Sequence, residues 1–254
     1  MFKAEFKRNQ MNFYSVIIGT ELLNGRRKDA HFEFLNSELN RRGWEHKASF
    51  VIKDEPKFIE DVFAFVKSDP KSVMFSFGGI GATPDDYTRV AAANVFRDGK
   101  MQYQSDAKSK IESMFGQEAY PHRIEMANLP IGAGLLENIV SGVPGFFVDE
   151  RFFFVPGFPS MAKHMVLEAL ERFYPISSQK IRLTLVAETG ENALIDTMKL
   201  MSDDVEMSSL PQIHGEIRRV VICVSGYDEI SVQSNFKKFT DFLEQEKIQF
   251  KLGE

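Results

Sequence analysis

Cysteine is almost absent from this sequence, and basic residues are not in surplus. Of 254 residues only Cys223 is a cysteine, which excludes an internal disulfide and a zinc site built from several cysteines. Such sparse cysteine usage is typical of a reducing compartment, so we expect a cytoplasmic protein. Lys and Arg number 31 against 36 Asp and Glu, a net charge of −5, so we expect no nucleic-acid partner. No window approaches the roughly 18 uninterrupted apolar residues of a membrane span, and we expect no membrane association.

Common catalytic motifs built on histidine or serine are also missing. The five histidines, spread from His31 to His214, show no HxH or HExxH spacing, so we expect them at the surface or supporting other residues. Ser141 and Ser160 lack a GxSxG frame. The sequence therefore does not support hydrolysis through a serine nucleophile.

What is present is the composition of a folded protein, with 43% hydrophobic and 26% charged residues. Residues 1–12 are expected to be a flexible extension. Beyond them, short β-branched runs alternate with helical apolar spacing, which predicts a mostly parallel sheet covered by helices in a three-layer α/β/α domain. The expected strands are 13–19, 45–52, 72–77 and 151–155, and the expected helices are 29–42, 54–67, 85–95, 106–115 and 160–173.

Two shorter extended pieces, 134–138 and 145–148, complete this domain, which we place at 13–174. A linker is expected at 175–179. Residues 178–254 then read as a small α+β domain. Its expected strands are 180–187 and 217–225, and its expected helices are 191–201 and 230–246.

The segment FGGIGATPDDYTR, residues 77–89, is the strongest candidate for chemistry. Glycines between a strand and a helix let backbone N–H groups close on an anion, and the helix N-terminus adds positive charge. Two carboxylates beside a phosphate are consistent with a divalent cation between them. The alternative interpretation is that Asp85 caps the helix and Asp86 is a first-turn charge. The candidate ligand-binding residues in this segment are Gly78, Gly79, Gly81, Thr83, Asp85, Asp86 and Thr88.

Three further polar stretches follow predicted strands. They are GTELLNGRRKD at 19–29, KDE at 53–55 and VPGFPS at 155–160. Because ligands bind at the carboxyl ends of the strands in open α/β sheets, we expect all four stretches to form one site. The basic run 26–28 is either a solvated turn or a phosphate clamp. The candidate site residues here are Gly19, Glu21, Asp54, Pro156, Gly157 and Ser160. Asp29 is either a site residue or a helix cap, and the alternative for Asp54 is likewise a helix cap.

The same stretches resemble a known family. GTELLNGRRKD is similar to the GDELLxGxxxDTN segment of the molybdopterin-binding domain superfamily, and FGGIGATPDDYTR resembles its GGxGPTPDDLT signature in the CinA (competence/damage-inducible protein A) branch. MANLPIGAGLLEN at 126–138 and VPGFPSMAKHM at 155–165 resemble later motifs of that branch. The resemblance runs from about residue 13 to 173. The tail is similar to the small domain that follows in CinA-like proteins.

The resemblance implies the three-layer fold and a small-molecule ligand, a phosphorylated pterin or nucleotide. It implies Asp54 and Asp86 as catalytic residues and metal ligands, with Mg²⁺ or another divalent cation, potassium as a further cofactor, and a homodimer or higher oligomer. The expected function is a metal-dependent pyrophosphatase for an ADP-ribose-like or FAD-like substrate. Molybdopterin adenylyltransfer is one alternative. A non-catalytic binding protein is another, because Thr20 and Met161 stand where the family has carboxylates.

Overall fold

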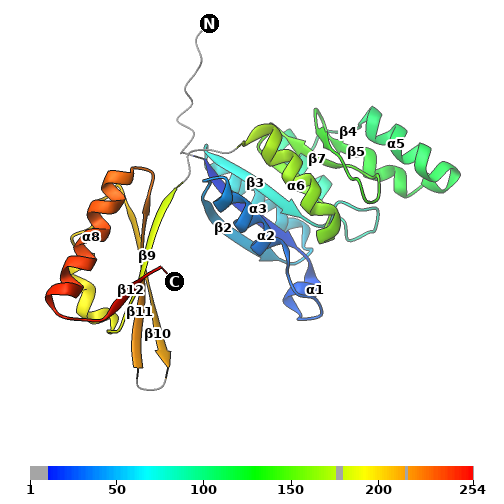
Figure 1. The fold of residues 1–254 in the computed structure, drawn as a ribbon. Coiled ribbons are helices and arrows are strands. Elements are labelled where there is room, and N and C mark those ends of the chain that lie inside the picture. The colour runs from blue at the N-terminus through cyan, green and yellow to red at the C-terminus, as the bar shows by residue number, and fades with distance from the viewer. Residues whose placement is uncertain (1–10, 176–179, 215–216, 254) are drawn as a thin grey trace, which may run out of the picture. The chain divides into compact units, whose positions relative to one another are not determined.

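A computed structural model describes residues 11–175, 180–214 and 217–253 (Figure 1). The chain forms two compact units that divide between Ser177 and Ser178. The flexible extension expected at 1–12 lies outside the described residues except for Met11 and Asn12. At these two positions the prediction is wrong, because Met11 packs on the core and Asn12 pairs with Ser72 in the sheet. The linker expected at 175–179 lies outside the described residues beyond Pro175.

The first unit is built on a six-stranded mixed sheet in the order β2-β1-β3-β8-β7-β6. β2, β1, β3 and β8 run parallel, and β7 and β6 add on antiparallel at one side. The strands are β1 (Asn12–Ile18), β2 (His46–Ile52), β3 (Ser72–Phe77), β6 (Gly134–Leu136), β7 (Gly145–Val148) and β8 (Phe152–Val155). The mostly parallel sheet expected from the sequence is confirmed, with an antiparallel addition.

Helices cover both faces of this sheet, which gives the expected three layers. Val16 of β1 packs in one core with α3 (Pro56–Ser68) and α4 (Thr88–Arg97). The neighbouring Ile17 packs on the other face against α2 (His31–Arg41) and α6 (Pro159–Phe173). A strand buried on both faces reads as a continuous apolar run, which is why FYSVII was recognisable in the sequence.

Between α4 and β6 the chain forms a small lobe that the sequence left poorly defined. The short strands β4 (Met101–Tyr103) and β5 (Asn128–Pro130) pair antiparallel. Between them lie α5 (Ser105–Phe115) and two short 3₁₀ helices, η2 (Gly116–Ala119) and η3 (Arg123–Ala127). A one-turn helix, α1 (Thr20–Leu23), follows β1 directly.

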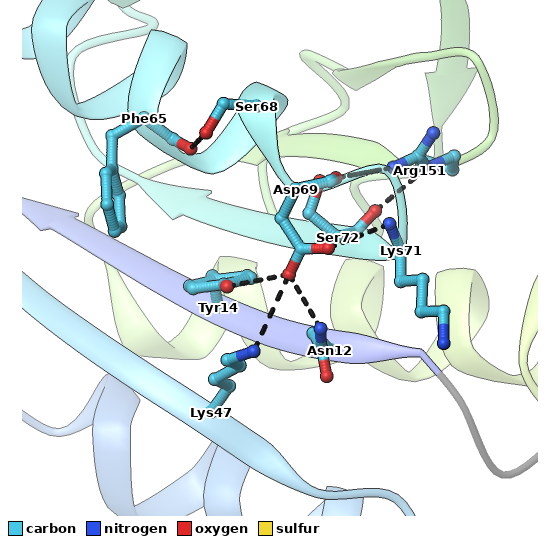
Figure 2. A network of polar contacts seen from close by, with 9 residues as sticks. All are labelled: Asn12, Tyr14, Lys47, Phe65, Ser68, Asp69, Lys71, Ser72 and Arg151. Atoms are coloured by element: carbon cyan, nitrogen blue, oxygen red, sulfur yellow. Dashed lines mark hydrogen bonds and ion pairs between the residues drawn. The ribbon is translucent and has the colours of Figure 1, made fainter.

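At the amino ends of the parallel strands, the carboxylate of Asp69 is enclosed by donors (Figure 2). Its oxygens accept hydrogen bonds from Asn12 Nδ2 at 2.6 Å, Tyr14 Oη at 2.8 Å and the Lys71 backbone N–H at 2.9 Å. Arg151, just before β8, donates to the Ser72 carbonyl at 2.8 Å. This network ties the starts of β1, β3 and β8 together.

The second unit is a four-stranded antiparallel sheet in the order β10-β11-β9-β12. Its elements are β9 (Ile181–Ala187), η4 (Glu191–Leu194), α7 (Ile195–Met198), β10 (Glu206–His214), β11 (Ile217–Gly226), α8 (Glu229–Gln245) and β12 (Phe250–Leu252). The stretch expected to be helical at 191–201 is helical from 191 to 198, where η4 passes directly into the short α7. In the described ranges, no helix of either unit is long and apolar enough to cross a membrane.

Candidate functional site

The four polar stretches meet at one pocket of about 490 Å³ at the carboxyl ends of the parallel strands. One wall comes from the turn after β1, a second from Asp54, two residues beyond the end of β2, a third from the loop after β3 and a fourth from the turn after β8. Of the residues expected from the sequence, the pocket is lined by Gly19, Glu21, Asp54, Gly78, Gly79, Gly81, Thr83, Asp85, Asp86, Pro156 and Gly157.

The loop after β3 is shaped by glycines that no other residue can replace without strain. Gly78 and Gly79 have φ of 99° and 69°, in the left-handed region that L side chains avoid. A Cβ on Gly78 would lie 2.5 Å from the Ile18 carbonyl oxygen, and one on Gly79 would lie 2.3 Å from Thr88 Oγ1. The loop can therefore press against β1 and α4 only with glycine at both positions.

This loop leaves backbone donors open. Gly78 N–H donates to Val155 in the sheet, and Thr83 N–H donates to Asp86. Between them, the N–H groups of residues 79 to 82 have no hydrogen-bond acceptor among the described residues. Consecutive N–H groups in a glycine turn form an anion-binding concavity, and unpaired ones are costly unless solvent or a ligand satisfies them. The loop therefore suits a phosphate.

Asp54 and Asp86 are each held through one oxygen. Asp54 Oδ2 accepts from the Thr20 N–H at 2.7 Å and from Thr20 Oγ1 at 2.9 Å. Asp86 Oδ2 accepts from the Thr83 N–H at 2.8 Å and from Thr83 Oγ1 at 2.6 Å. The second oxygen of each carboxylate has no protein partner in the described part of the chain. Thr20, where the family-like motif has an acid, thus orients Asp54.

A divalent cation fits this donor set only with help from the ligand. Within the described ranges, no three His, Cys, Asp or Glu side chains converge on a common point as a metal cage would require. Mg²⁺ is commonly bound by one or two carboxylates together with water and substrate phosphates. The open oxygens of Asp54 and Asp86, in a pocket that also holds the phosphate loop, meet that pattern.

Asp85 lines the pocket, whereas Asp29 caps a helix. Asp85 lines the pocket, and because α4 begins only at Thr88, it does not cap that helix. The Thr83 side chain holds the pKa of Asp85 below its usual value. Asp29 instead accepts the N–H groups of His31 and Phe32 at the start of α2, so the capping interpretation describes it.

Thr88 was expected to bind the ligand, but it does not line the pocket. Its side chain is fully buried, and its hydroxyl donates to the Gly78 carbonyl at 2.9 Å. Arg89 is also buried, and its guanidinium donates to the Gly81 carbonyl at 2.8 Å and to the Glu125 carbonyl. Burial lowers the pKa of Arg89. Both side chains support the glycine loop from behind.

The turn after β8 is held by residues from the turn after β1. Arg27 Nη2 donates to the Gly157 carbonyl at 3.1 Å, and His31 Nε2 lies 3.2 Å from the same oxygen. His31 is buried against Phe77, and burial lowers its pKa. It is a supporting residue, which is one of the two alternatives expected for the histidines. Ser160 was expected in the site, but it is exposed on α6 and does not line the pocket.

Further residues line the pocket, and of these only Arg27, in the basic run 26–28, was considered as a phosphate ligand from the sequence. They are Ile18, Arg27, Ile80, Ala82, Met126, Asn138, Ser141, Val143, Pro144, Phe158 and Met161. Asn138 organises its loop, donating to Ser141 Oγ at 2.7 Å and to the Val143 carbonyl at 2.9 Å. The available signal for this wall was the family-like segment at 126–138, which begins with Met126 and ends with Asn138.

Comparison with known proteins adds a family to this geometry. Residues 15–175 match the model of a probable molybdopterin binding domain. A CinA-like protein of Synechocystis is 32% identical over 157 residues, which cover 59% of this chain and 37% of that protein. A protein of Pyrococcus abyssi is 25% identical over 253 residues, covering 94% of this chain and 98% of its own length.

Among solved structures, the crystal structure of the protein CinA of unknown function from Thermoplasma acidophilum is similar with a TM-score of 0.58. It is 27% identical and covers 65% of this chain and 99% of that chain. This chain spans little more than a third of the Synechocystis relative but nearly all of the archaeal one. Since the family match covers well over half of its residues, this chain belongs to the molybdopterin-binding domain family and has CinA-like relatives.

Proposed function

We propose that this protein is a metal-dependent nucleotide pyrophosphatase acting on an ADP-ribose-like or FAD-like substrate. One observation carries the proposal: the N–H groups of residues 79 to 82, which have no acceptor among the described residues, share a pocket with Asp54 and Asp86. Each of these carboxylates keeps one oxygen without a partner in the same part of the chain. Donors for a phosphate beside ligands for a cation are the parts that pyrophosphate hydrolysis requires.

Each group in the pocket has its own role in this reaction. The loop N–H groups bind non-bridging phosphate oxygens and hold the phosphorus in place. A divalent cation, when bound, supplies neutralisation of the pyrophosphate charge. Asp54 and Asp86 hold it through their open oxygens, and either carboxylate can orient a water molecule for attack. Thr20 and Thr83 fix the two carboxylates, so little reorganisation is needed when substrate arrives.

The test is product analysis by mass spectrometry on the purified full chain with ADP-ribose, FAD and NAD, each with Mg²⁺ or Co²⁺ plus K⁺. We expect AMP from at least one substrate. We expect Asp86→Asn to lower the rate by about 100-fold or more, the scale typical of a lost catalytic carboxylate. Asp61→Asn is the matched control, because this carboxylate is exposed on α3 and pairs with Lys57 outside the pocket. Full activity of Asp86→Asn would remove Asp86 from the mechanism.

A binding protein without turnover is the second candidate. It is favoured by Met161, which lines the pocket where the family motif has a glutamate, and by Thr20, which occupies one oxygen of Asp54. On this view Asp54 shapes the site and performs no chemistry. Tight binding of a nucleotide or pterin phosphate with no product under any of the metals would decide for it.

A further inference from the structure

We infer that Phe158 is a stacking platform for a planar heterocycle of the ligand, beside the phosphate loop. The inference deepens the proposed function and rests on its phosphate site, but it does not require turnover. The ligand chemistry is a flat aromatic heterocycle joined through a sugar or methylene group to a phosphate. Adenine nucleotides, flavin mononucleotide and pterin phosphates share that chemistry.

The pocket has a polar side and an apolar side. The polar side is the glycine loop with its carboxylates. The apolar side is formed by Met126, Val143, Pro144, Phe158 and Met161. Inorganic phosphate has no apolar part that could contact an apolar wall. Pockets that bind larger ligands are lined mainly by apolar and aromatic side chains. The wall therefore indicates that an apolar part accompanies the phosphate.

Phe158 is the aromatic residue of this wall, and it is held in position. Its side chain is 58% exposed, yet the guanidinium carbon of Arg27 lies 5.4 Å from its ring centroid, in cation–π range. Arg27 is itself fixed by the Gly157 carbonyl at 3.1 Å and by Glu21 at 3.6 Å. A ring braced by a cation and otherwise exposed loses little freedom when a second ring stacks on it.

The platform and the phosphate loop are neighbours. A Cβ built on Gly157 would lie 3.3 Å from Gly78 Cα, so the turn after β8 packs directly on the start of the glycine loop. Phe158 follows Gly157, and the open N–H groups begin at Gly79. This adjacency matches a ligand whose ring and phosphate are separated by one short connecting group.

The experiment measures dissociation constants by calorimetry for the full-length chain with Mg²⁺. The probes are AMP, flavin mononucleotide and 6-hydroxymethylpterin phosphate, which carry a ring, and ribose 5-phosphate, which carries none. Phe158→Ala should weaken binding of the preferred ring-bearing probe about tenfold, since stacking of a base on an aromatic side chain contributes on that scale. Ribose 5-phosphate binding should not change, and Phe158→Tyr should restore the affinity.

Phe65→Ala is the matched control. Phe65 is 59% exposed on α3, and its ring contacts Phe50 outside the pocket. If Phe158→Ala and Phe65→Ala bind every probe alike, or if ribose 5-phosphate binds wild type as tightly as the ring-bearing probes, the platform is refuted while the phosphate site stands. If no phosphate probe binds, both proposals fail. Ring-dependent binding without any hydrolysis would retain the platform and refute the pyrophosphatase.

Discussion

The two ends of the six-stranded sheet use polar side chains in opposite ways. At the amino ends of the strands, the Asp69 carboxylate accepts hydrogen bonds from Asn12, Tyr14 and Lys71 (Figure 2). At the carboxyl ends, Asp54 and Asp86 each keep one oxygen without a protein partner in the described part of the chain. One end joins elements of the sheet together, and the other presents polar groups to a pocket.

The contrast shows that a carboxylate near a strand end does not by itself indicate a binding site. Its hydrogen-bond partners distinguish a structural carboxylate from one that can bind a ligand. Burial alone would raise the pKa of Asp69, but its hydrogen-bond donors outweigh burial and lower it overall. The contacts of Asp69 are thus those of a structural residue. The open donors and acceptors at the other end are those of a binding site.

The largest effect is expected for Gly79→Ala at the pocket end. An alanine in the left-handed φ region lowers the free energy of unfolding by roughly 1–2 kcal/mol, and its contact with the buried Thr88 hydroxyl lowers it further. We expect a total decrease of about 3 kcal/mol. The affinity for a phosphate ligand should also decrease, because the loop must shift to make room for the methyl group. Urea unfolding and calorimetry with ADP measure the two effects.

Gly132→Ala serves as its control, since Gly132 also has a positive φ, but no atom of the described residues lies within 4 Å of a Cβ built there. In that variant the free energy of unfolding should decrease only by the conformational cost of the left-handed φ, and the affinity for ADP should be unchanged. Equal losses in the two variants would show that the packing of the loop on α4 is unimportant.

A smaller effect is expected for Asp69→Ala at the opposite end. The Tyr14 hydroxyl and the Asn12 amide would each lose a charged acceptor, which should cost about 2 kcal/mol of unfolding free energy. Ligand affinity and any turnover should remain as in wild type, because the pocket lies at the other strand ends. A matching loss of ligand affinity in the folded variant would break the division between the two ends.

The smallest effect is expected for the stability of the protein at acid pH. The pKa of Asp69 in the folded protein lies below that of a free aspartate, because its hydrogen-bond donors favour the charged form. The charged form therefore stabilises the folded protein at higher pH. That contribution is present above the unfolded pKa and is lost as pH falls through the folded one. Between about pH 5 and pH 2, wild type should therefore lose more stability than Asp69→Asn. Parallel unfolding curves for the two proteins across this range would contradict the role of the charge.

Strands with strong local signals were predictable, and strands that depend on a neighbour were not. Ser72–Phe77 and Gly145–Val148 were predicted at the observed limits, because a run of buried apolar residues ends at clear turn signals. β10 was missed, because EMSSLPQIH is rich in serine and contains Pro211. It is a strand because β11 supplies a complete hydrogen-bonding partner. Tertiary pairing overrode weak local propensity there.

The candidate site was predictable to the level of its loops, and less so to the level of single side chains. Asp54 and Asp86 were expected together, since each follows a strand of the same sheet. Thr88 and Ser160 were also expected there, but α4 buries Thr88 and α6 turns Ser160 to solvent. Sequence position places a residue near a strand end, whereas the direction of its side chain depends on where the helix begins.

By itself, the sequence determined the order of the main strands and helices of the first unit, its parallel core and the glycine loop. Those features follow from local propensity, apolar period and backbone freedom. Only the tertiary structure decided which polar groups are satisfied. It gave Asp69 its donors and set Phe158 against Arg27. It also left the N–H groups of residues 79 to 82 without an acceptor in the part of the chain that the structure describes. Hydrogen-bond satisfaction is a property of neighbours distant in the chain, and no local pattern encodes it.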